Sequence, residues 1–311
     1  MLVILSDREV YIDKNRKYLK GNLHTHTTNS DGDYSVREVL NIYKNNGYDF
    51  LGITDHEVFC EEEYNEGITL IHGVEESSLY VRDDDRRGTY AHFNCFIPKM
   101  KVKPEVKFYE NASDLQKNID ELNKMYSLVQ FNHPLFSRLT DNEHLSLNGY
   151  DVIEIFNNKD FLQETGIYSA DTLIRTLLNN HKKFLISAND DFHGPYYGTK
   201  IDRCFGGFNM VCADNNEESI LDAIKSGNFY PSTGPLILDL RREGKVFKIE
   251  TSPVKRIIFY SNIRRCKNIY DLNDGEITKG EYELKGSEYY VWVKIIDNSG
   301  KCAWSQPIYL D

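Results

Sequence analysis

Residues 50–56 read FLGITDH, a short apolar run that ends in Asp55 and His56. Apolar runs of similar length recur along the first part of the chain, and most are soon followed by a histidine or a carboxylate. Bounded apolar runs of this length predict buried strands. The further runs are ITLIHGV (68–74), SLVQF (127–131), DVIEIF (151–156) and KFLISA (183–188).

Segments with helical periodicity lie between these runs. Candidate helices begin at Ser35 and at Ser113, where Glu38 and Gln116 complete the spacing of a capping box. Two more helices are expected over 170–180 and 216–225. Strands that alternate with helices favour an α/β fold with a mostly parallel sheet or a barrel.

The pattern changes after Gly234 and Pro235. From there on, short β-rich runs are separated by Gly, Asn, Asp and Ser, without a helical period and without a histidine. The sequence therefore predicts two domains, a larger one over 1–235 and a small all-β domain over 236–311.

Composition limits the partners. The net charge of −11 argues against binding of long nucleic acids but allows a small anionic substrate, because bound metal ions can invert the local field. We find no apolar run of membrane-spanning length and no basic region ahead of the short apolar N-terminus, so we expect a cytoplasmic protein without membrane contact. The charged stretch 82–87 is expected to be a solvated loop.

The six cysteines are scattered and never spaced as C-x-x-C. This spacing argues against a disulfide framework and against a cysteine zinc site. All six are expected to be small buried side chains.

Residues with metal-binding side chains gather near the ends of the predicted strands. His24 and His26, two apart in LHTHTTNSDG (23–32), share one face of an extended segment, and Asp31 follows in a turn. In a barrel, the ends of several strands meet at one mouth, which carries the active site. The members expected there are His24, His26, Asp31, His56, Glu75, His133, Asp191 and His193, with His92 of AHFNCF as a further candidate.

The remaining histidines are assigned other places. His72 is expected to be structural, within its strand, and His144 and His181 are expected to be exposed. Nucleophile-elbow, P-loop and dinucleotide motifs are missing from the sequence, and His56-Glu57 does not continue as H-E-x-x-H because position 60 is Cys.

In this order, HTHTTNSDG, GITDH, GVE, NHP and DDFH resemble the PHP (polymerase and histidinol phosphatase) superfamily over about residues 20–235. Three further segments, AHFNCF, FYPSTGP and GKCAWSQPIYL, resemble its CehA/McbA-type branch. The resemblance implies a distorted, TIM-like (β/α)7 barrel that binds two or three divalent ions. It also implies nine metal ligands: His24, His26, Asp31, His56, Glu75, His92, His133, Asp191 and His193.

Imidazole and carboxylate ligands suit Zn, Mn or Fe. Glu75, Asp191 and His193 are the expected catalytic residues, with Glu75 as a ligand that bridges two ions. Of the adjacent Asp190 and Asp191, the second is preferred because Asp-x-His puts both side chains on one side.

Four residues are candidates for supporting roles. Arg138 and Lys159 are positioned to hold a phosphate, although each can equally be a solvated surface charge. Asp55 and Asp190 are candidates for orienting the ligands, and a plain turn role is open for Asp55.

The sequence therefore predicts a metal-dependent phosphoesterase that hydrolyses a small phosphorylated substrate, such as a nucleotide, by means of a metal-bridged hydroxide. One alternative keeps the metals but cleaves a carboxylic ester or carbamate. The other is a non-catalytic metal-binding interaction module.

Overall fold

The computed structural model describes residues 9–64, 66–81, 89–101, 103–195, 204–264, 266–273 and 275–310. The stretch 82–87, expected to be a solvated loop, lies outside these residues. The chain divides into two compact units, Lys20–Gly207 and Met1–Leu19 with Phe208–Asp311. The domain boundary predicted at residue 235 stays a prediction.

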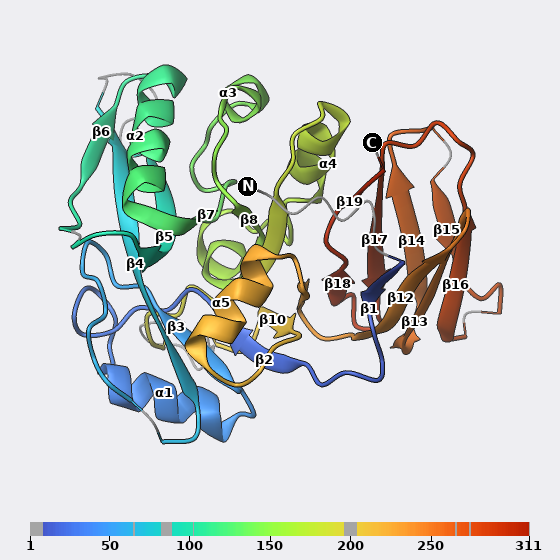
Figure 1. Cartoon of the computed structure of the whole chain (residues 1–311), viewed down its shortest axis with the longest axis horizontal. Coiled ribbons are helices and arrows are strands. Elements are labelled where there is room, and N and C mark those ends of the chain that lie inside the picture. The colour runs from blue at the N-terminus through green and yellow to red at the C-terminus, as the bar shows by residue number, and fades with distance from the viewer. Residues whose placement is uncertain are drawn as a thin grey trace. The chain divides into compact units, whose positions relative to one another are not determined.

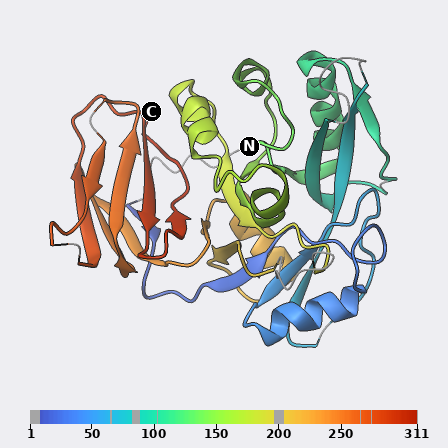
Figure 2. The same ribbon diagram turned by 180° about the vertical axis from the view of Figure 1, so that it is seen from behind.

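The first unit is built on a mixed sheet (Figures 1 and 2). β5 runs antiparallel to both of its neighbours, whereas the pairs on either side of it are parallel. The expectation of a mostly parallel sheet therefore misses β5. The strands follow the order β2 (Leu19–Asn22), β3 (Phe50–Ile53), β4 (Thr69–Tyr80), β5 (Tyr90–Pro98), β7 (Tyr126–Phe131), β8 (Val152–Asn157) and β9 (Leu185–Asn189), and β6 (Lys107–Tyr109) pairs with β4.

The two ends of this strand order approach each other. An isolated parallel bridge pairs Thr25, just beyond β2, with Phe192, just beyond β9. Among the described residues, strand pairing does not close the sheet into a ring. The structure thus establishes a mixed α/β fold with a large sheet.

The three helices predicted for this unit are present, with small shifts at their ends, and two further helical segments were not predicted. α1 (Val36–Asn45) starts at the predicted capping box of Ser35 and Glu38, and its apolar side packs on β3. α2 (Ala112–Met125) packs on β6 and β7. The others are α3 (Asp141–Ser146), the π-helix η2 (Asp160–Glu164) and α4 (Asp171–Asn179).

The cap predicted for the second helix is wrong by two residues. Asn111, not Ser113, is the N-cap of α2, and its side-chain oxygen accepts from the backbone N–H groups of Ser113 and Asp114 at 2.9 and 3.1 Å. Asparagine caps at least as well as serine, so the earlier residue takes the position.

His144 is buried, which corrects its expected exposure. It lies in α3, only 2% exposed, and its ring lies 5.6 Å from that of Phe131 in β7. The capping box of Thr140 and Glu143 fixes the start of α3, and His144, the next residue, faces Phe131 of β7. His181 is exposed, as predicted, and His72 lies in β4 with Nε2 2.9 Å from the carbonyl oxygen of Glu62.

The second unit contains two antiparallel sheets. One has the order β1 (Val10–Ile12), β12 (Ile237–Glu243), β13 (Val246–Val254) and β16 (Ile277–Glu283). The other has the order β15 (Lys267–Ile269), β14 (Arg256–Ser261), β17 (Tyr290–Ile296), β18 (Cys302–Trp304), β11 (Phe229–Ser232) and β10 (Phe208–Val211). β19 (Ile308–Tyr309) also pairs with β17. Helix α5 (Glu217–Lys225) lies between β10 and β11 in the sequence. Apolar side chains of both sheets, Phe247 and Phe259 among them, form one core. The β-rich texture predicted after residue 235 is confirmed.

No disulfide joins the six cysteines, all of which lie in described residues. Cys60, Cys95, Cys204 and Cys302 are buried as expected, whereas Cys212 and Cys266 are only half-buried. Within the described ranges, the helices are too short or too polar to cross a bilayer.

The cap of α2 provides a test of the fold. Asn111→Ala should lower the free energy of unfolding by about 1 kcal/mol, because two backbone N–H groups lose their acceptor. Ser113→Ala, two residues on, should change it by less than about 0.5 kcal/mol. Equilibrium urea unfolding of both variants measures the difference, and an equal or larger loss in Ser113→Ala would restore serine as the cap.

Candidate metal centre

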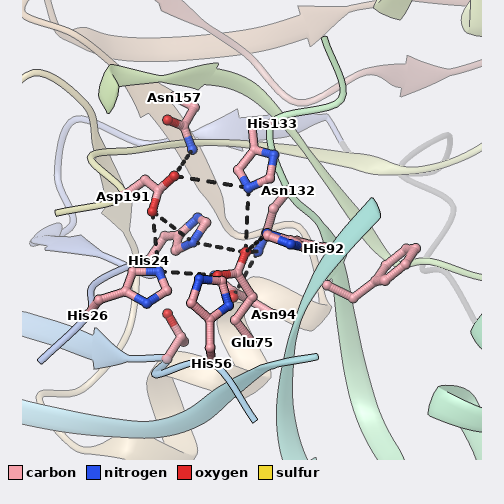
Figure 3. A network of polar contacts seen from close by, with 12 residues as sticks. His24, His26, His56, Glu75, His92, Asn94, Asn132, His133, Asn157 and Asp191 are labelled. Carbon is pink, nitrogen blue, oxygen red and sulfur yellow. Dashed lines mark hydrogen bonds and ion pairs between the residues drawn. The ribbon is translucent and has the colours of Figure 1, made fainter. Parts of the chain in front are cut away.

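The predicted ligands at strand ends come together in one cluster, and Figure 3 labels five of them, His24, His26, His56, His133 and Asp191. His24 and His26 follow β2, His56 follows β3, and His133 follows β7. Asp191 and His193 follow β9, and Asp31 lies in the turn beyond His26. The backbone dihedral φ is positive at His133 and Asp191, at 25° and 54°. Non-glycine residues seldom adopt this conformation, and it is concentrated at functional sites.

Glu75 and His92 reach the cluster from strand interiors rather than from strand ends. β4 continues five residues past Glu75 to Tyr80, so the predicted end of this strand is wrong. His92 of β5 lies opposite Ser77, which shares a face of β4 with Glu75. The antiparallel pairing of β5 thus brings His92 to the cluster.

The Glu75 carboxylate is the centre of the cluster. It is 1% exposed, and five imidazoles surround it. Oε1 lies 3.2 Å from His24 Nε2, 3.2 Å from His92 Nδ1 and 3.5 Å from His133 Nε2. Oε2 lies 3.2 Å from both His26 Nε2 and His56 Nδ1. Each carboxylate oxygen therefore faces its own set of imidazoles, an arrangement that allows one carboxylate to contact two ions.

Asp191 forms a second centre beside Glu75. Its Oδ1 atom lies 3.3 Å from His24 Nε2, 3.2 Å from His26 Nε2 and 3.4 Å from His193 Nδ1. Asp31 lies at the rim, with its side chain 55% exposed, and its oxygens are 3.4 Å from His26 Nδ1 and 3.3 Å from His193 Nε2. All nine predicted ligands are thus close together.

The donor atoms fit divalent metal ions. Among the described residues, four groups have one donor atom each within 4.8 Å of one another: His26, Asp31, His56 and His193; His24, His133 and Asp191; His24, His26 and Glu75; and His56, Glu75 and His92. Several of these buried metal-binding atoms have no hydrogen-bond partner among the described residues. They include Nε2 of His24, both ring nitrogens of His26 and Oδ1 of Asp191. Native proteins rarely leave such groups unsatisfied, so this points to bound cations.

The charges of the cluster influence one another strongly. Burial by itself lowers the pKa of His24, but the carboxylates of Asp191 and Glu75 outweigh it and hold this pKa well above its usual value. The same opposition raises the pKa of His26 to about 9. Burial raises the pKa of Glu75, yet the imidazoles around it, His24 first, bring it well below the usual value. Without metal, protons therefore take the place of cations on His24 and His26.

Glu154 is a supporting residue that the sequence analysis missed. It lies in β8, fully buried, and its Oε1 atom is 2.9 Å from His24 Nδ1. Its Oε2 atom accepts from the backbone N–H of His133 at 2.7 Å and from Asn157 Nδ2 at 2.9 Å. One carboxylate thus fixes two predicted ligands and leaves Nε2 of His24 to face the cluster. A charged residue inside the apolar run DVIEIF was the available signal.

Buried side-chain amides hold Glu75 in place, and the sequence analysis did not predict this role for them. Asn132 Nδ2 donates to Glu75 Oε1 at 2.7 Å and to Asn94 Oδ1 at 2.9 Å. Gln130 Nε2 in turn donates to Asn132 Oδ1 at 2.9 Å. Figure 3 shows Asn94 and Asn132 beside Glu75. The sequence signal was weak, since asparagine next to a ligand is common in turns.

Asp55 and Asp190 hold loops rather than imidazoles. Asp55 accepts from the backbone N–H and hydroxyl of Thr27, each at 2.7 Å, and from the Ser30 hydroxyl at 2.7 Å, which fixes the turn that leads to Asp31. Asp190 accepts from the Tyr43 hydroxyl at 2.7 Å and from the backbone N–H groups of residues 205–207. Asp191, not Asp190, therefore lies in the cluster, in agreement with the preferred register.

The two predicted phosphate-binding residues have different surroundings. Lys159 Nζ lies 3.8 Å from Asp191 Oδ2 and 3.5 Å from His193 Nε2. Arg138 is exposed and is not among the residues that line the pocket at the cluster. That pocket is lined by His56, Glu75, His92, His133, Phe136, Lys159, Asp160, Glu164 and Asp191. The structure thus brings Lys159 to the site and leaves Arg138 outside it.

The role of Glu154 can be tested by metal binding. Glu154→Gln keeps the size of the side chain but removes one acceptor and the negative charge next to His24, so affinity for Zn or Mn should fall about 10- to 100-fold. Glu121→Gln, on the exposed side of α2, is the matched control and should leave affinity unchanged. Competition against a chromogenic chelator measures both, and equal affinities in the two variants would contradict the role.

Metal binding should also release protons near neutral pH. His24 and His26 carry raised pKa values, so both are protonated at pH 7, and an imidazole must lose its proton before that nitrogen can bind a metal. Apparent affinity should therefore rise with pH until the pKa of His26, about 9, is passed. Calorimetry in buffers of different ionisation enthalpy counts the protons, and no release at pH 7 would show that these imidazoles are already neutral.

No family model and no curated protein matches the chain. Solved structures do. One is a two-domain protein containing a predicted PHP-like metal-dependent phosphoesterase from Bacteroides vulgatus, 15% identical, with 92% of each chain covered and a TM-score of 0.49. Another is a candidate metal-dependent phosphoesterase from Bifidobacterium adolescentis, 13% identical, covering 58% of this chain and 90% of that one, with a TM-score of 0.40. The chain is thus similar to PHP-like metal-dependent phosphoesterases, although a likeness of this degree assigns no activity, which depends on the side chains of the site.

Proposed function

We propose that this chain is a metal-dependent hydrolase that cleaves phosphoesters of small molecules, nucleotides among them. The observation that carries the proposal is the convergence of nine metal-binding side chains in one cluster, five of which line a pocket that Lys159 also lines. The donor set suits Zn, Mn or Fe, and its overlapping groups suit two or three ions.

Charge favours a phosphorylated substrate. Two or three divalent cations would outweigh the three ligand carboxylates Asp31, Glu75 and Asp191, so the loaded ligand set would be positive within a protein of net charge −11. Lys159 adds a further positive charge at the edge of the same pocket. A phosphate group carries more negative charge than a carboxylic ester or a carbamate, and it gains more from such a field.

When bound, the ions supply Lewis acidity and a water of lowered pKa as the nucleophile. The chain's own groups would hold and orient. Glu75 would hold metal through its carboxylate, while Asp191 and His193 would hold metal on the side of Lys159. Lys159 would hold a phosphoryl oxygen and balance the charge that grows on it during cleavage.

We further infer that Lys20–Gly207 forms the distorted barrel of the PHP fold. The bridge between Thr25 and Phe192 supports this, because it links the segments after the first and last strands of the sheet order. The backbone N–H of His26 also donates to the carbonyl oxygen of Phe192 at 2.8 Å. The cytoplasmic location and the CehA/McbA-type branch remain proposals from the sequence.

The test is an assay of protein loaded with Zn, Mn or Fe against p-nitrophenyl phosphate, nucleoside monophosphates, and p-nitrophenyl acetate as the carboxylic ester. Phosphate release should require metal and should fall more than about 100-fold in His24→Ala, because a ligand to the cluster is lost. His72→Ala, a histidine of β4 outside the four donor groups, is the matched control. Faster ester than phosphoester cleavage, or turnover that survives His24→Ala, would refute the proposal.

A further inference from the structure

One wall of the pocket beside the cluster comes from the π-helix η2. Lys159, Asp160 and Glu164 line the pocket together with Phe136, which comes from the segment after β7. Single π-turns within proteins are often found at functional sites. This wall contains the ammonium group of Lys159 and the carboxylates of Asp160 and Glu164. Neither carboxylate belongs to the four groups of candidate metal ligands.

Asp160 is the unusual member of this wall. It is only 6% exposed, and its Oδ1 atom has no hydrogen-bond partner among the described residues, although it lines a pocket that opens next to the metal ligands. A buried carboxylate oxygen without a partner is strongly unfavourable. When Asp160 is ionised, its free oxygen calls for a hydrogen-bond donor, because an ionised carboxylate can only accept.

The backbone holds Asp160 in a fixed position relative to the cluster. Its N–H donates to Asn157 Oδ1 at 2.9 Å, and its carbonyl oxygen accepts from the Thr165 N–H at 3.0 Å. Asn157 Nδ2 reaches Glu154 Oε2 at 2.9 Å and Asp191 Oδ2 at 3.3 Å. The Lys159 N–H donates to the carbonyl oxygen of Asp190 at 3.1 Å. The turn is therefore tied to β8, which carries Glu154, and to the segment after β9, which carries Asp191.

The two ends of the turn favour different parts of a substrate. Lys159, which lies near Asp191 and His193, attracts the phosphoryl group. Asp160 and Glu164 repel a second anionic group and attract O–H or N–H donors. A site built to hydrogen-bond a substrate group discriminates strongly against analogues that lack it.

We propose that Asp160, with Glu164 at the exposed rim, selects phosphomonoesters whose alcohol portion carries a hydrogen-bond donor, a hydroxyl or an ammonium group, close to the ester. The inference rests on the proposed phosphoesterase function and adds the class of substrate. Under it, esters that carry a second phosphate or a carboxylate at this position are poor substrates.

Three phosphate esters of matched size test the selection: n-propyl, 2-hydroxyethyl and 2-aminoethyl phosphate, which differ in one terminal group. Asp160→Ala in the metal-loaded, full-length protein should lower kcat/KM for the hydroxyl and ammonium esters about 10- to 100-fold and change n-propyl phosphate less than about threefold. If kcat/KM falls only for 2-aminoethyl phosphate, the substrates are esters of amino alcohols. If it falls for both polar esters, a hydroxyl group is sufficient.

Two further variants separate the ends of the pocket. Lys159→Ala should lower kcat/KM for all three esters by a similar factor of about 10, because Lys159 acts on their shared phosphoryl group. Leu162→Ala lies in the same turn with a side chain that does not line the pocket, and it should change none of them. Asp160→Asn keeps the volume of the side chain and serves where Asp160→Ala does not fold; it should lower the preference for the ammonium ester most.

Binding of the corresponding phosphonates gives a readout that does not need turnover. Calorimetry with 3-aminopropyl-, 3-hydroxypropyl- and n-butylphosphonate should show the same loss of discrimination in Asp160→Ala, with unchanged metal content. Equal weakening of all three phosphonates, or a loss of metal, would overturn the proposal and make Asp160 a structural support of the cluster instead. If discrimination disappears as expected but no phosphoester is cleaved, the proposed function fails and the selectivity stands.

Discussion

The structure depends on the burial of one carboxylate, Glu75, among five imidazoles. A charge with 1% exposure is tolerated only where opposite charges and hydrogen bonds replace water. In the metal-free chain, raised pKa values put protons on His24 and His26, and these supply part of the missing positive charge. Metal ions would do so more completely, because one ion neutralises more charge than one proton and can satisfy several donors at once. The donor atoms around Glu75 therefore suit a set of cations.

This constraint explains why the interior of the sheet is so polar near the site. Asn132 and Asn94 fix Glu75, and Glu154 fixes His24 and the backbone of His133. Each of these groups is fully buried and hydrogen-bonded, which makes it rigid. A metal site needs such rigidity, because a loosely held ligand binds with less selectivity and lower affinity.

Much of this could be predicted from the sequence, for a physical reason. A strand end is marked locally, by an apolar run and the polar residue after it, so His56, His133 and Asp191 could be located without knowing the fold. Positions that depend on pairing between distant strands could not. His92 reaches the site only because β5 runs antiparallel to β4, and Glu154 acts only because β8 brings it under His24. His144 was misjudged because its burial depends on how α3 packs against β7, not on its polar neighbours.

The segment that leads from β8 into η2 connects metal binding to substrate binding. Glu154 holds His24, Asn157 contacts both Glu154 and Asp191, and the N–H of Asp160 is bound to Asn157. Lys159 stands between them, near Asp191 and His193. Within seven residues, the chain passes from groups that orient metal ligands to groups that face the pocket. A change in the position of Asp191 on metal binding would therefore reach Asp160 through a single amide, that of Asn157. Asn157 thus contacts both the carboxylates beside the metal ligands and the turn that lines the pocket.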